Sequence, residues 1–159
     1  MALTEDKNRK ARGSGQKLKV AIATSSTVYV GSLVCRRNTT GRCLAATAAT
    51  GRRILGVVER LDSDADGPGS GTGVGNTGGT QYAMIRYLDE RSFTVATAIR
   101  TNTSLGLNVF VSDDDKVCGT AAGTAGKRVA VGELVAWDAS DKSTGWVAIR
   151  RFATTNIAV

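Results

Sequence analysis

From Leu18 onward the chain is a series of short apolar segments separated by Gly, Ser, Thr, Asn and Asp. Hydrophobic and polar residues alternate in several segments; in residues 81–88, for example, Ala83, Ile85 and Tyr87 are expected on one face of a strand. β-branched residues are frequent in the same segments, which also favours strands. No segment combines a 3.6-residue period with helix caps. The pattern predicts an all-β protein, a small antiparallel β-barrel or sandwich.

Short polar turns join the predicted strands. The strands comprise residues 18–23, 27–37, 42–44, 54–61, 81–88, 91–100, 107–112, 116–118, 129–137 and 145–152. The sequence NTTG at residues 38–41 predicts a hairpin between the strands on either side of it. The short turn at residues 88–91 predicts a second antiparallel hairpin. The loop 138–145 predicts a third, with Trp137 and Trp146 at its ends, where the rings are expected to stack across the strand pair as core residues.

The chain contains two related segments, which begin at Gly31 and Gly106 and align almost without a gap. Gly31 aligns with Gly106, Val34 with Val109, Cys43 with Cys118, Ala46 with Ala121, Gly51 with Gly126, Arg53 with Arg128 and, after one inserted residue, Gly56 with Gly132, Val58 with Val135 and Asp62 with Asp138. A solenoid needs about three repeats, so these two predict one compact body with two related halves, residues 31–62 and 106–138. Gly56 and Gly132 lie inside matching strands, which predicts that each strand bends there to close a small barrel.

Residues 1–19 are polar and basic, contain Gly-Ser-Gly, and predict an extended, flexible arm that becomes ordered only against a partner. For the first dozen residues a cloning or processing remnant is an equally open interpretation. Residues 20–159 are expected to form a single β domain. Within it, the Gly-rich residues 62–80 predict a long loop that reaches away from the body. The loop contains GSGTGVG, but no helix follows to hold a phosphate, so no nucleotide or other cofactor is expected.

The composition indicates neither disulfides nor a metal site. At 159 residues the chain can bury enough surface for a self-supporting core. Its three cysteines, Cys35, Cys43 and Cys118, lack the spacing of metal ligands, and the sequence contains no histidine. Cys43 and Cys118 are expected as small apolar residues at equivalent inward positions of the two halves.

The sequence also argues against an enzyme. Histidine, the commonest general acid or base near neutral pH, is missing. Acidic residues form clusters at 62–66 and 113–115, which are expected on the surface, where no apolar wall would raise a pKa. The chain has no apolar segment long enough for a transmembrane helix and no signal peptide, so a soluble protein made in the cytoplasm is expected.

The net charge of +7 implies a partner with a negative surface. The candidate contact residues are Lys7, Arg9, Lys10 and Arg12 in the arm and Arg52, Arg53, Lys127 and Arg128 in the body. The last four form two matched pairs, each after a Gly and before a bent strand, and solvated turn residues are an equally open interpretation. Some nonspecific affinity for DNA is expected. The basic residues of the body, however, are scattered at strand ends and turns with few aromatic residues nearby, unlike a specific nucleic-acid surface; they are Arg36, Arg37, Arg42, Arg52, Arg53, Lys127, Arg128, Arg150 and Arg151.

Two stretches, GSLVCRRNTTGRCLAATAATGRRILGVV from Gly31 and SLGLNVFVSDDDKVCGTAAGTAGKRVAVGELVAWD from Ser104, resemble the head decoration proteins of tailed bacteriophages, also called cement or capsid-stabilising proteins. The resemblance extends over residues 18–152 and consists of recurrent Gly and Val positions rather than a chemical signature. The positions that carry it are Gly31, Gly51, Gly56, Val57 and Val58 in the first half and Gly106, Val109, Phe110, Val111, Val131, Gly132 and Val135 in the second.

The resemblance implies a non-enzymatic β-barrel protein of the virion, commonly a homotrimer. Such a protein binds the outer surface of the mature head and clamps neighbouring subunits of the major capsid protein. The eight basic residues would then contact the capsid or a neighbouring subunit, with the arm ordered there. The long loop 62–80 departs from the shortest family members, and whether it faces the capsid, a subunit or solvent stays open.

Two other kinds of protein remain as alternatives, a receptor-binding or adhesion module of a virion and a basic nucleic-acid-binding protein. An enzyme is the least favoured. No membrane, specific nucleic acid, small-molecule substrate, cofactor or metal is expected as a partner.

Overall fold

The computed structural model describes residues 3–4, 7, 9–24, 26–47, 52–63, 67–68, 74–75, 81–119, 122–123, 126–127 and 129–150. Only the backbone is described for residues 62, 63, 67, 68, 74, 75, 122, 123, 126 and 127. Within these ranges the chain is all-β, as the sequence predicts, and its helical elements are two short 3-10 turns, η1 (Thr97–Ile99) and η2 (Asn102–Ser104). No helix in the described ranges is long and apolar enough to cross a membrane.

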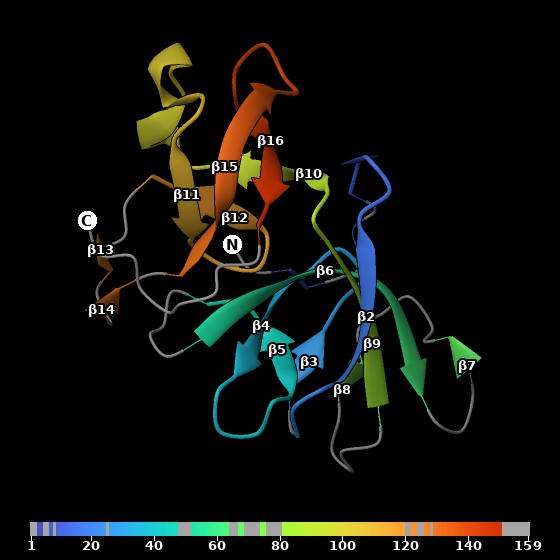
Figure 1. Cartoon of the computed structure of the whole chain (residues 1–159). Helices are drawn as coiled ribbons and strands as arrows, with labels where there is room; N and C mark the ends of the chain where they lie inside the picture. The colour runs from blue at the N-terminus through green and yellow to red at the C-terminus, as the bar shows by residue number, and fades with distance from the viewer. Residues whose placement is uncertain are drawn as a thin grey trace.

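The described residues form sixteen strands, which follow one another along the chain (Figure 1). They are β1 (Ala11–Arg12), β2 (Gln16–Ala21), β3 (Thr27–Val28), β4 (Leu33–Arg37), β5 (Cys43–Ala45), β6 (Arg52–Ser63), β7 (Gly67–Pro68), β8 (Val74–Gly75), β9 (Gln81–Tyr87), β10 (Glu90–Val95), β11 (Asn108–Val111), β12 (Lys116–Cys118), β13 (Ala122–Gly123), β14 (Gly126–Lys127), β15 (Ala130–Trp137) and β16 (Thr144–Ile149).

The second half of the chain forms a closed five-stranded β-barrel, in the order β10-β12-β11-β15-β16, with β16 pairing back to β10. Its neighbouring strands are antiparallel except β10 and β12, which run parallel with Val95 opposite Val117. Each of the five strands contributes an apolar side chain that is fully or almost fully buried; these include Phe93, Val109, Val117, Leu134 and Val147. In Figure 1 this barrel forms the upper part of the molecule.

The first half repeats this strand arrangement, in the order β2-β9-β6-β4-β5. A single parallel bridge connects the two ends of the sheet, between Ile22, just after β2, and Cys43 in β5. Beside it the N–H of Ala23 donates to the carbonyl oxygen of Cys43 at 2.8 Å. The strands β2, β4, β5, β6 and β9 thus correspond to β10, β11, β12, β15 and β16. A separate apolar core lies in this half and consists of Ile22, Val28, Val34, Cys43, Leu55, Val58, Leu61, Ala83 and Ile85.

The predicted bend at the two matching glycines is confirmed. The pairing of β4 with β6 shifts register between Val34 and Cys35, opposite Gly56, and that of β11 with β15 shifts after Val109, opposite Gly132. Gly56 has a φ of +144°, which L-residues rarely adopt, and a Cβ atom on Gly132 would collide with the carbonyl oxygen of Ala148. Glycine is therefore required in both strands, and each half uses it to bend a long strand.

Cys43 occupies the predicted inward position, in the core of the first half, but Cys118 does not: Val117 lies in the larger core, so the side chain of Cys118 is on the opposite face of the strand. All three are buried and free. Cys43 lies opposite Arg36 in the first hairpin, whereas Val117, not Cys118, lies opposite the aligned residue Val111 in the second. The second turn is one residue shorter, which moves Cys118 one position along its strand. The gap-free alignment across this turn is therefore wrong.

The hairpins predicted at residues 38–41 and 138–145 are confirmed as β4–β5 and β15–β16. The hairpin predicted at residues 88–91 is wrong. The strand before it, β9, pairs with β2 and β6, while the strand after it, β10, pairs with β1, β12 and β16. Leu88, with a φ of +57°, lies where the chain passes from one half to the other. Strand β9 belongs to the sheet of the first half and β10 to the barrel of the second, so the two strands do not pair with each other.

The predicted stacking of the two tryptophans is also wrong. The register pairs Trp146 with Ala136 and Trp137 with Gly145, so the two rings project from opposite faces. Trp137 packs against the larger apolar core, while the guanidinium carbon of Arg12 lies 4.0 Å from the ring centre of Trp146.

The larger apolar core continues from the second barrel into the first half. It includes Leu33, Cys35, Ile54 and Val57, which lie on the face of β4 and β6 opposite the first core. The two halves therefore pack directly against each other. Within the Gly-rich loop 62–80, the described pieces β7 and β8 pair with β6 and β3 of the first half, and the rest lies outside the described residues.

Candidate binding surface

The N-terminal basic residues lie against the second half rather than extending into solvent. Lys7 Nζ and Lys10 Nζ each lie 2.8 Å from a carboxylate, of Asp115 and Asp138 respectively. Strand β1 pairs with β10, and β2 begins at Gln16, inside the segment assigned to the arm. The described part of residues 1–19 is thus bound to the chain's own body, which differs from the expected arm.

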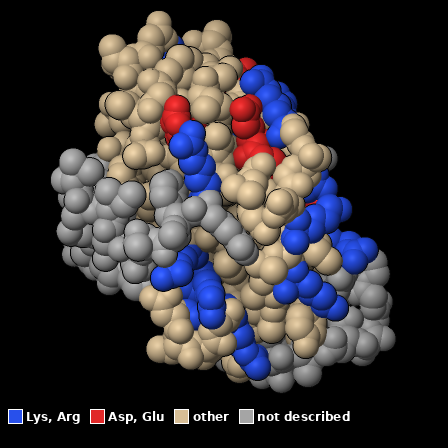
Figure 2. Space-filling model, viewed as in Figure 1, with Lys and Arg blue, Asp and Glu red and all other residues tan. Residues whose placement is uncertain are grey.

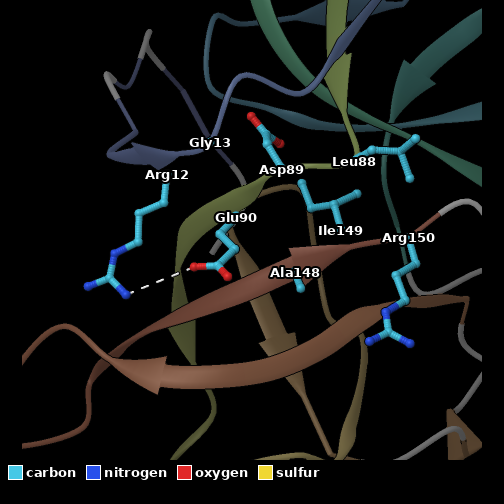
Figure 3. Close-up of a pocket in the computed structure, with 8 residues that line it drawn as sticks. All are labelled: Arg12, Gly13, Leu88, Asp89, Glu90, Ala148, Ile149 and Arg150. Carbon is cyan, nitrogen blue, oxygen red and sulfur yellow. Dashed lines mark ion pairs between the residues drawn. The ribbon is translucent and has the colours of Figure 1, made fainter.

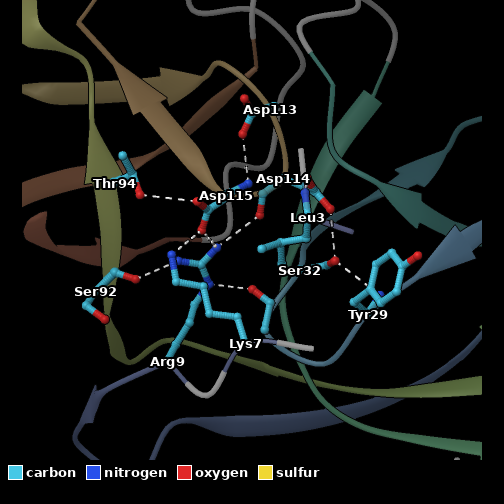
Figure 4. A network of polar contacts seen from close by, with 11 residues as sticks. Leu3, Lys7, Arg9, Tyr29, Ser32, Ser92, Thr94, Asp113, Asp114 and Asp115 are labelled. Carbon is cyan, nitrogen blue, oxygen red and sulfur yellow. Dashed lines mark hydrogen bonds and ion pairs between the residues drawn. The ribbon is translucent and has the colours of Figure 1, made fainter. Parts of the chain in front are cut away.

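Arg9 is at the centre of this attachment (Figure 4). Only 5% of the residue is exposed. Its guanidinium donates to the carbonyl oxygens of Gly31, Ser92 and Asp114, the last two at 2.8 and 3.1 Å, and to Asp115 Oδ1 at 2.8 Å. Gly31 belongs to the first half and the other partners to the second, so Arg9 joins the N-terminal segment to both halves. Its side chain has no face left for a second protein.

The adjacent residues Asp114 and Asp115 have pKa values shifted in opposite directions. Asp114 is 2% exposed, and burial raises its pKa, while the Leu3 N–H and the Ser32 hydroxyl, which donate to it, oppose the rise. Burial also acts to raise the pKa of Asp115, but hydrogen bonding to Lys7 and the charge of Arg9 outweigh it, so this pKa is lowered. The expectation that the acidic cluster 113–115 lies on the surface is therefore wrong for Asp114.

Arg52 and Arg53 belong to a group of arginines that the fold brings together from three strands. We call it the arginine cluster, and it consists of Arg36 and Arg37 at the end of β4, Arg42 before β5, and Arg52 and Arg53 at the start of β6. Arg36 lies directly opposite Arg53, and Arg37 directly opposite Arg52. The N–H of Arg37 also donates to the carbonyl oxygen of Arg42 at 2.9 Å, so Arg42 lies opposite Arg37 on its other side.

The arginine cluster lies at one end of the sheet, and its side chains are divided between the two faces, because neighbouring side chains of a strand point to opposite faces. Arg37, Arg42 and Arg52 form a row across three adjacent strands, whose spacing is about 4.8 Å. Arg36 and Arg53 form a pair on the other face. Arg36, Arg37 and Arg53 are exposed. Like charges directly opposite each other in a sheet destabilise it, so both cross-strand pairs repel.

Four of the five arginines have no carboxylate partner among the described side chains. Arg36, Arg37, Arg52 and Arg53 have no ion pair with any acidic side chain in the described ranges, and Arg52 donates instead to the Thr47 hydroxyl at 2.6 Å. By contrast, Lys7, Arg9, Lys10, Arg12 and Arg91 are each within 4 Å of a carboxylate of the second half. Within the described ranges these four arginines thus differ from the basic residues that hold the N-terminal segment, since none of the four has an ion pair with a carboxylate.

The numbers of basic and acidic residues in the sequence also differ between the two halves. Residues 16–88 contain nine Lys and Arg and four Asp and Glu, whereas residues 89–149 contain six and eight. Figure 2 shows Lys and Arg side chains over the lower part of the molecule, where the first half lies, and acidic side chains gathered over the upper part. The first half is the basic one.

The remaining predicted contacts are only partly described. Lys127 lies in β14, where only the backbone is described, and Arg128 lies outside the described residues. Their expected equivalence to Arg52 and Arg53 therefore stays a prediction. Sequence reasoning noted Arg36, Arg37 and Arg42 but regarded them as scattered. The predicted hairpin at 38–41 already placed Arg37 opposite Arg42, but only the pairing of β4 with β6 adds the other arginines.

The described residues contain no group of His, Cys, Asp and Glu that could hold a metal ion. Burial raises the pKa of Cys43 to about 12, so this thiol stays protonated at neutral pH. The depression in Figure 3, of about 400 Å³, is lined by Arg12, Leu88, Asp89, Glu90, Ile149 and Arg150 among others. The Arg12 guanidinium there lies 3.9 Å from the Glu90 carboxylate, and both basic and acidic side chains line the depression. The depression therefore does not offer a ligand a surface of a single charge.

Comparison of the chain with protein-family models, with curated proteins and with solved structures finds no match. The binding surface is therefore interpreted from its own geometry and charge.

Proposed function

We propose that the chain is a head decoration protein of a tailed bacteriophage, which binds the outside of the mature capsid and clamps neighbouring major capsid subunits. The observation that carries the proposal is the arginine cluster on the first half, with its two like-charge cross-strand pairs, together with the Gly and Val positions that resemble this family. A surface with this much positive charge favours a partner with negative charge.

The way in which the two halves are joined supports a mechanical role. The larger apolar core extends into both halves and the buried Arg9 bonds to both, so the chain can transmit force between the points where it is held. We expect a homotrimer, since several linked contacts on a capsid can increase avidity by about 10² to 10⁴ over a single contact. Light scattering coupled to size-exclusion chromatography measures this oligomeric state.

Cryo-electron microscopy of purified heads, prepared with and without the chain, tests the proposed function. We expect added density on the outside of the shell over the seams between capsid subunits. Density inside the head, or none, would overturn the proposal. Heads that carry the chain should also resist heat or chelator treatment that opens bare heads, because the clamped seams must separate first.

A further inference from the structure

We propose that the arginine cluster is a carboxylate-binding site, and that its partner is a protein surface with closely spaced Asp and Glu side chains. The identity of this partner, the capsid, rests on the proposed function. The carboxylate specificity itself is argued from the geometry of two cross-strand pairs of the cluster, Arg36 with Arg53 and Arg37 with Arg52.

The arrangement of the guanidinium groups fits carboxylates. Guanidinium is planar and can donate two parallel hydrogen bonds to one carboxylate, a geometry that lysine cannot provide. Arg37 lies beside Arg52, and Arg36 beside Arg53, on the neighbouring strands β4 and β6, which are about 4.8 Å apart. Carboxylates spaced like neighbouring side chains on a partner's sheet or loop can therefore each meet one or two arginines.

The same surroundings disfavour a nucleic acid. Single strands are held by aromatic rings on which bases stack, and the segments 33–45 and 52–58 contain no aromatic residue. Duplex DNA is held by phosphate contacts spread along a backbone. The arginine cluster is compact and lies at the end of one sheet, where it can contact only a short piece of such a backbone.

Binding of carboxylates would also relieve strain in the free protein. Arg36 opposite Arg53 and Arg37 opposite Arg52 are like-charge pairs without a described acidic neighbour. A carboxylate placed between two guanidiniums replaces their repulsion by two charge-assisted hydrogen bonds. Affinity should therefore depend on the pairs themselves and not only on the net charge of the chain.

The experiment compares three double variants of the full chain, each of which removes two positive charges. R36Q/R53Q and R37Q/R52Q each remove one cross-strand pair, while the matched control K17Q/K19Q removes two exposed lysines from β2. Fluorescence anisotropy measures binding to labelled poly-L-glutamate and to a labelled DNA duplex at low salt. Circular dichroism first establishes that all three variants fold.

We expect each arginine variant to weaken poly-L-glutamate binding about tenfold or more, and the lysine variant by less than about threefold. Equal losses in all three variants would overturn the proposal, since net charge alone would then explain binding. Tighter binding to DNA than to poly-L-glutamate, lost in the arginine variants, would also overturn it and identify a nucleic-acid site.

Binding of the same variants to purified heads separates this inference from the proposed function. If wild-type chain binds poly-L-glutamate through the arginine cluster but does not bind heads, the proposed function fails and the carboxylate site stands. If heads bind wild type and both arginine variants equally well, decoration stands, and the arginine cluster is not its docking site.

Discussion

The turn between the first two strands of the repeat has opposite electrostatic roles in the two halves. In the first half it has the sequence NTTG at residues 38–41 and is flanked by the arginine cluster. In the second half it contains three consecutive aspartates, of which Asp114 and Asp115 bind the N-terminal segment. The hairpin and the bulge are present in both halves, while the charges at the turn differ, and those of the second half bind the N-terminal segment.

The two halves also differ in how completely they close. The barrel of the second half is closed by a parallel ladder between β10 and β12, whereas in the first half only the bridge between Ile22 and Cys43 connects β2 to β5. The N-terminal segment lies against the closed second half, whereas the arginine cluster lies at one end of the sheet of the first half. The predictions that follow test whether the charges of the second half stabilise the chain itself and those of the first half are left for a partner.

The largest expected effect is that of Arg9→Ala. Removing the guanidinium takes this donor from the carbonyl oxygens of Gly31, Ser92 and Asp114 and leaves Asp115 with only its contacts to two other side chains. We expect the free energy of unfolding to fall by about 3–5 kcal/mol, as measured by urea denaturation. The control is Lys10→Ala, which removes an exposed ion pair with Asp138 and should cost less than about 1 kcal/mol. Similar losses for both variants would mean that the N-terminal segment does not hold the halves together.

The next effect concerns the two bulged strands. In Gly132→Ala the new Cβ would collide with the carbonyl oxygen of Ala148, and in Gly56→Ala with that of Arg86. We expect each to lower the free energy of unfolding by about 1–3 kcal/mol or more. Gly13→Ala is the control, because Gly13 also has a positive φ but no atom lies within 4 Å of its added Cβ. If only one of the two bulge variants is destabilised beyond the control, the halves do not bend by the same means.

The third prediction contrasts the adjacent carboxylates of the second turn. Asp115 has a lowered pKa in the folded state, so its ionised form stabilises the fold above the unfolded value of about 3.9, and this contribution disappears as the pH falls through the folded-state pKa. Asp115→Asn should therefore cost about 1.5–3 kcal/mol at neutral pH, and its deficit should shrink in acid.

Asp114 should show the opposite trend. Its pKa is raised in the folded state, so its contribution is present below the unfolded value and is lost as the pH rises through the folded-state pKa. The stability of Asp114→Asn relative to wild type should thus improve as the pH rises from about 4 toward neutrality. Denaturation series over this range measure both variants. Parallel pH trends would show that the two carboxylates do not differ in their surroundings.

Much of this fold follows from residues that carry a local signal. The alternation in 81–87, the turn at 38–41 and the repeated Gly56 and Gly132 predicted strands, a hairpin and two bends that the structure contains. The wrong prediction with the largest effect on the topology, the hairpin at residues 88–91, concerns long-range pairing. The residues of the turn at Leu88 give no sign that β9 and β10 belong to different halves. The reason is that each of these strands pairs with a strand distant in sequence, β9 with β6 and β10 with β16.

The candidate site was predictable only in part for the same reason. Arg52 and Arg53 were recognised as a basic pair, but their like-charge contacts depend on the pairing of β4 with β6. Arg9 was expected at an interface with another protein because its neighbours are polar and charged. Its burial results from Asp115 and three carbonyl groups that lie more than twenty residues away, which no short sequence window contains.

The smallest expected effect is that of Arg53→Gln, which removes one member of the pair with Arg36. Because the two like charges repel, the substitution should raise the free energy of unfolding by about 0.2–1 kcal/mol at low salt. The gain should vanish in 1 M salt, where the Debye length is about 3 Å. Lys17→Gln is the control, since Lys17 lies 3.1 Å from Glu59 and its loss should leave stability unchanged or slightly lower. A loss of stability in Arg53→Gln at low salt would mean that the arginine cluster is already compensated within the chain, and the external role of the first half would no longer follow from its charge.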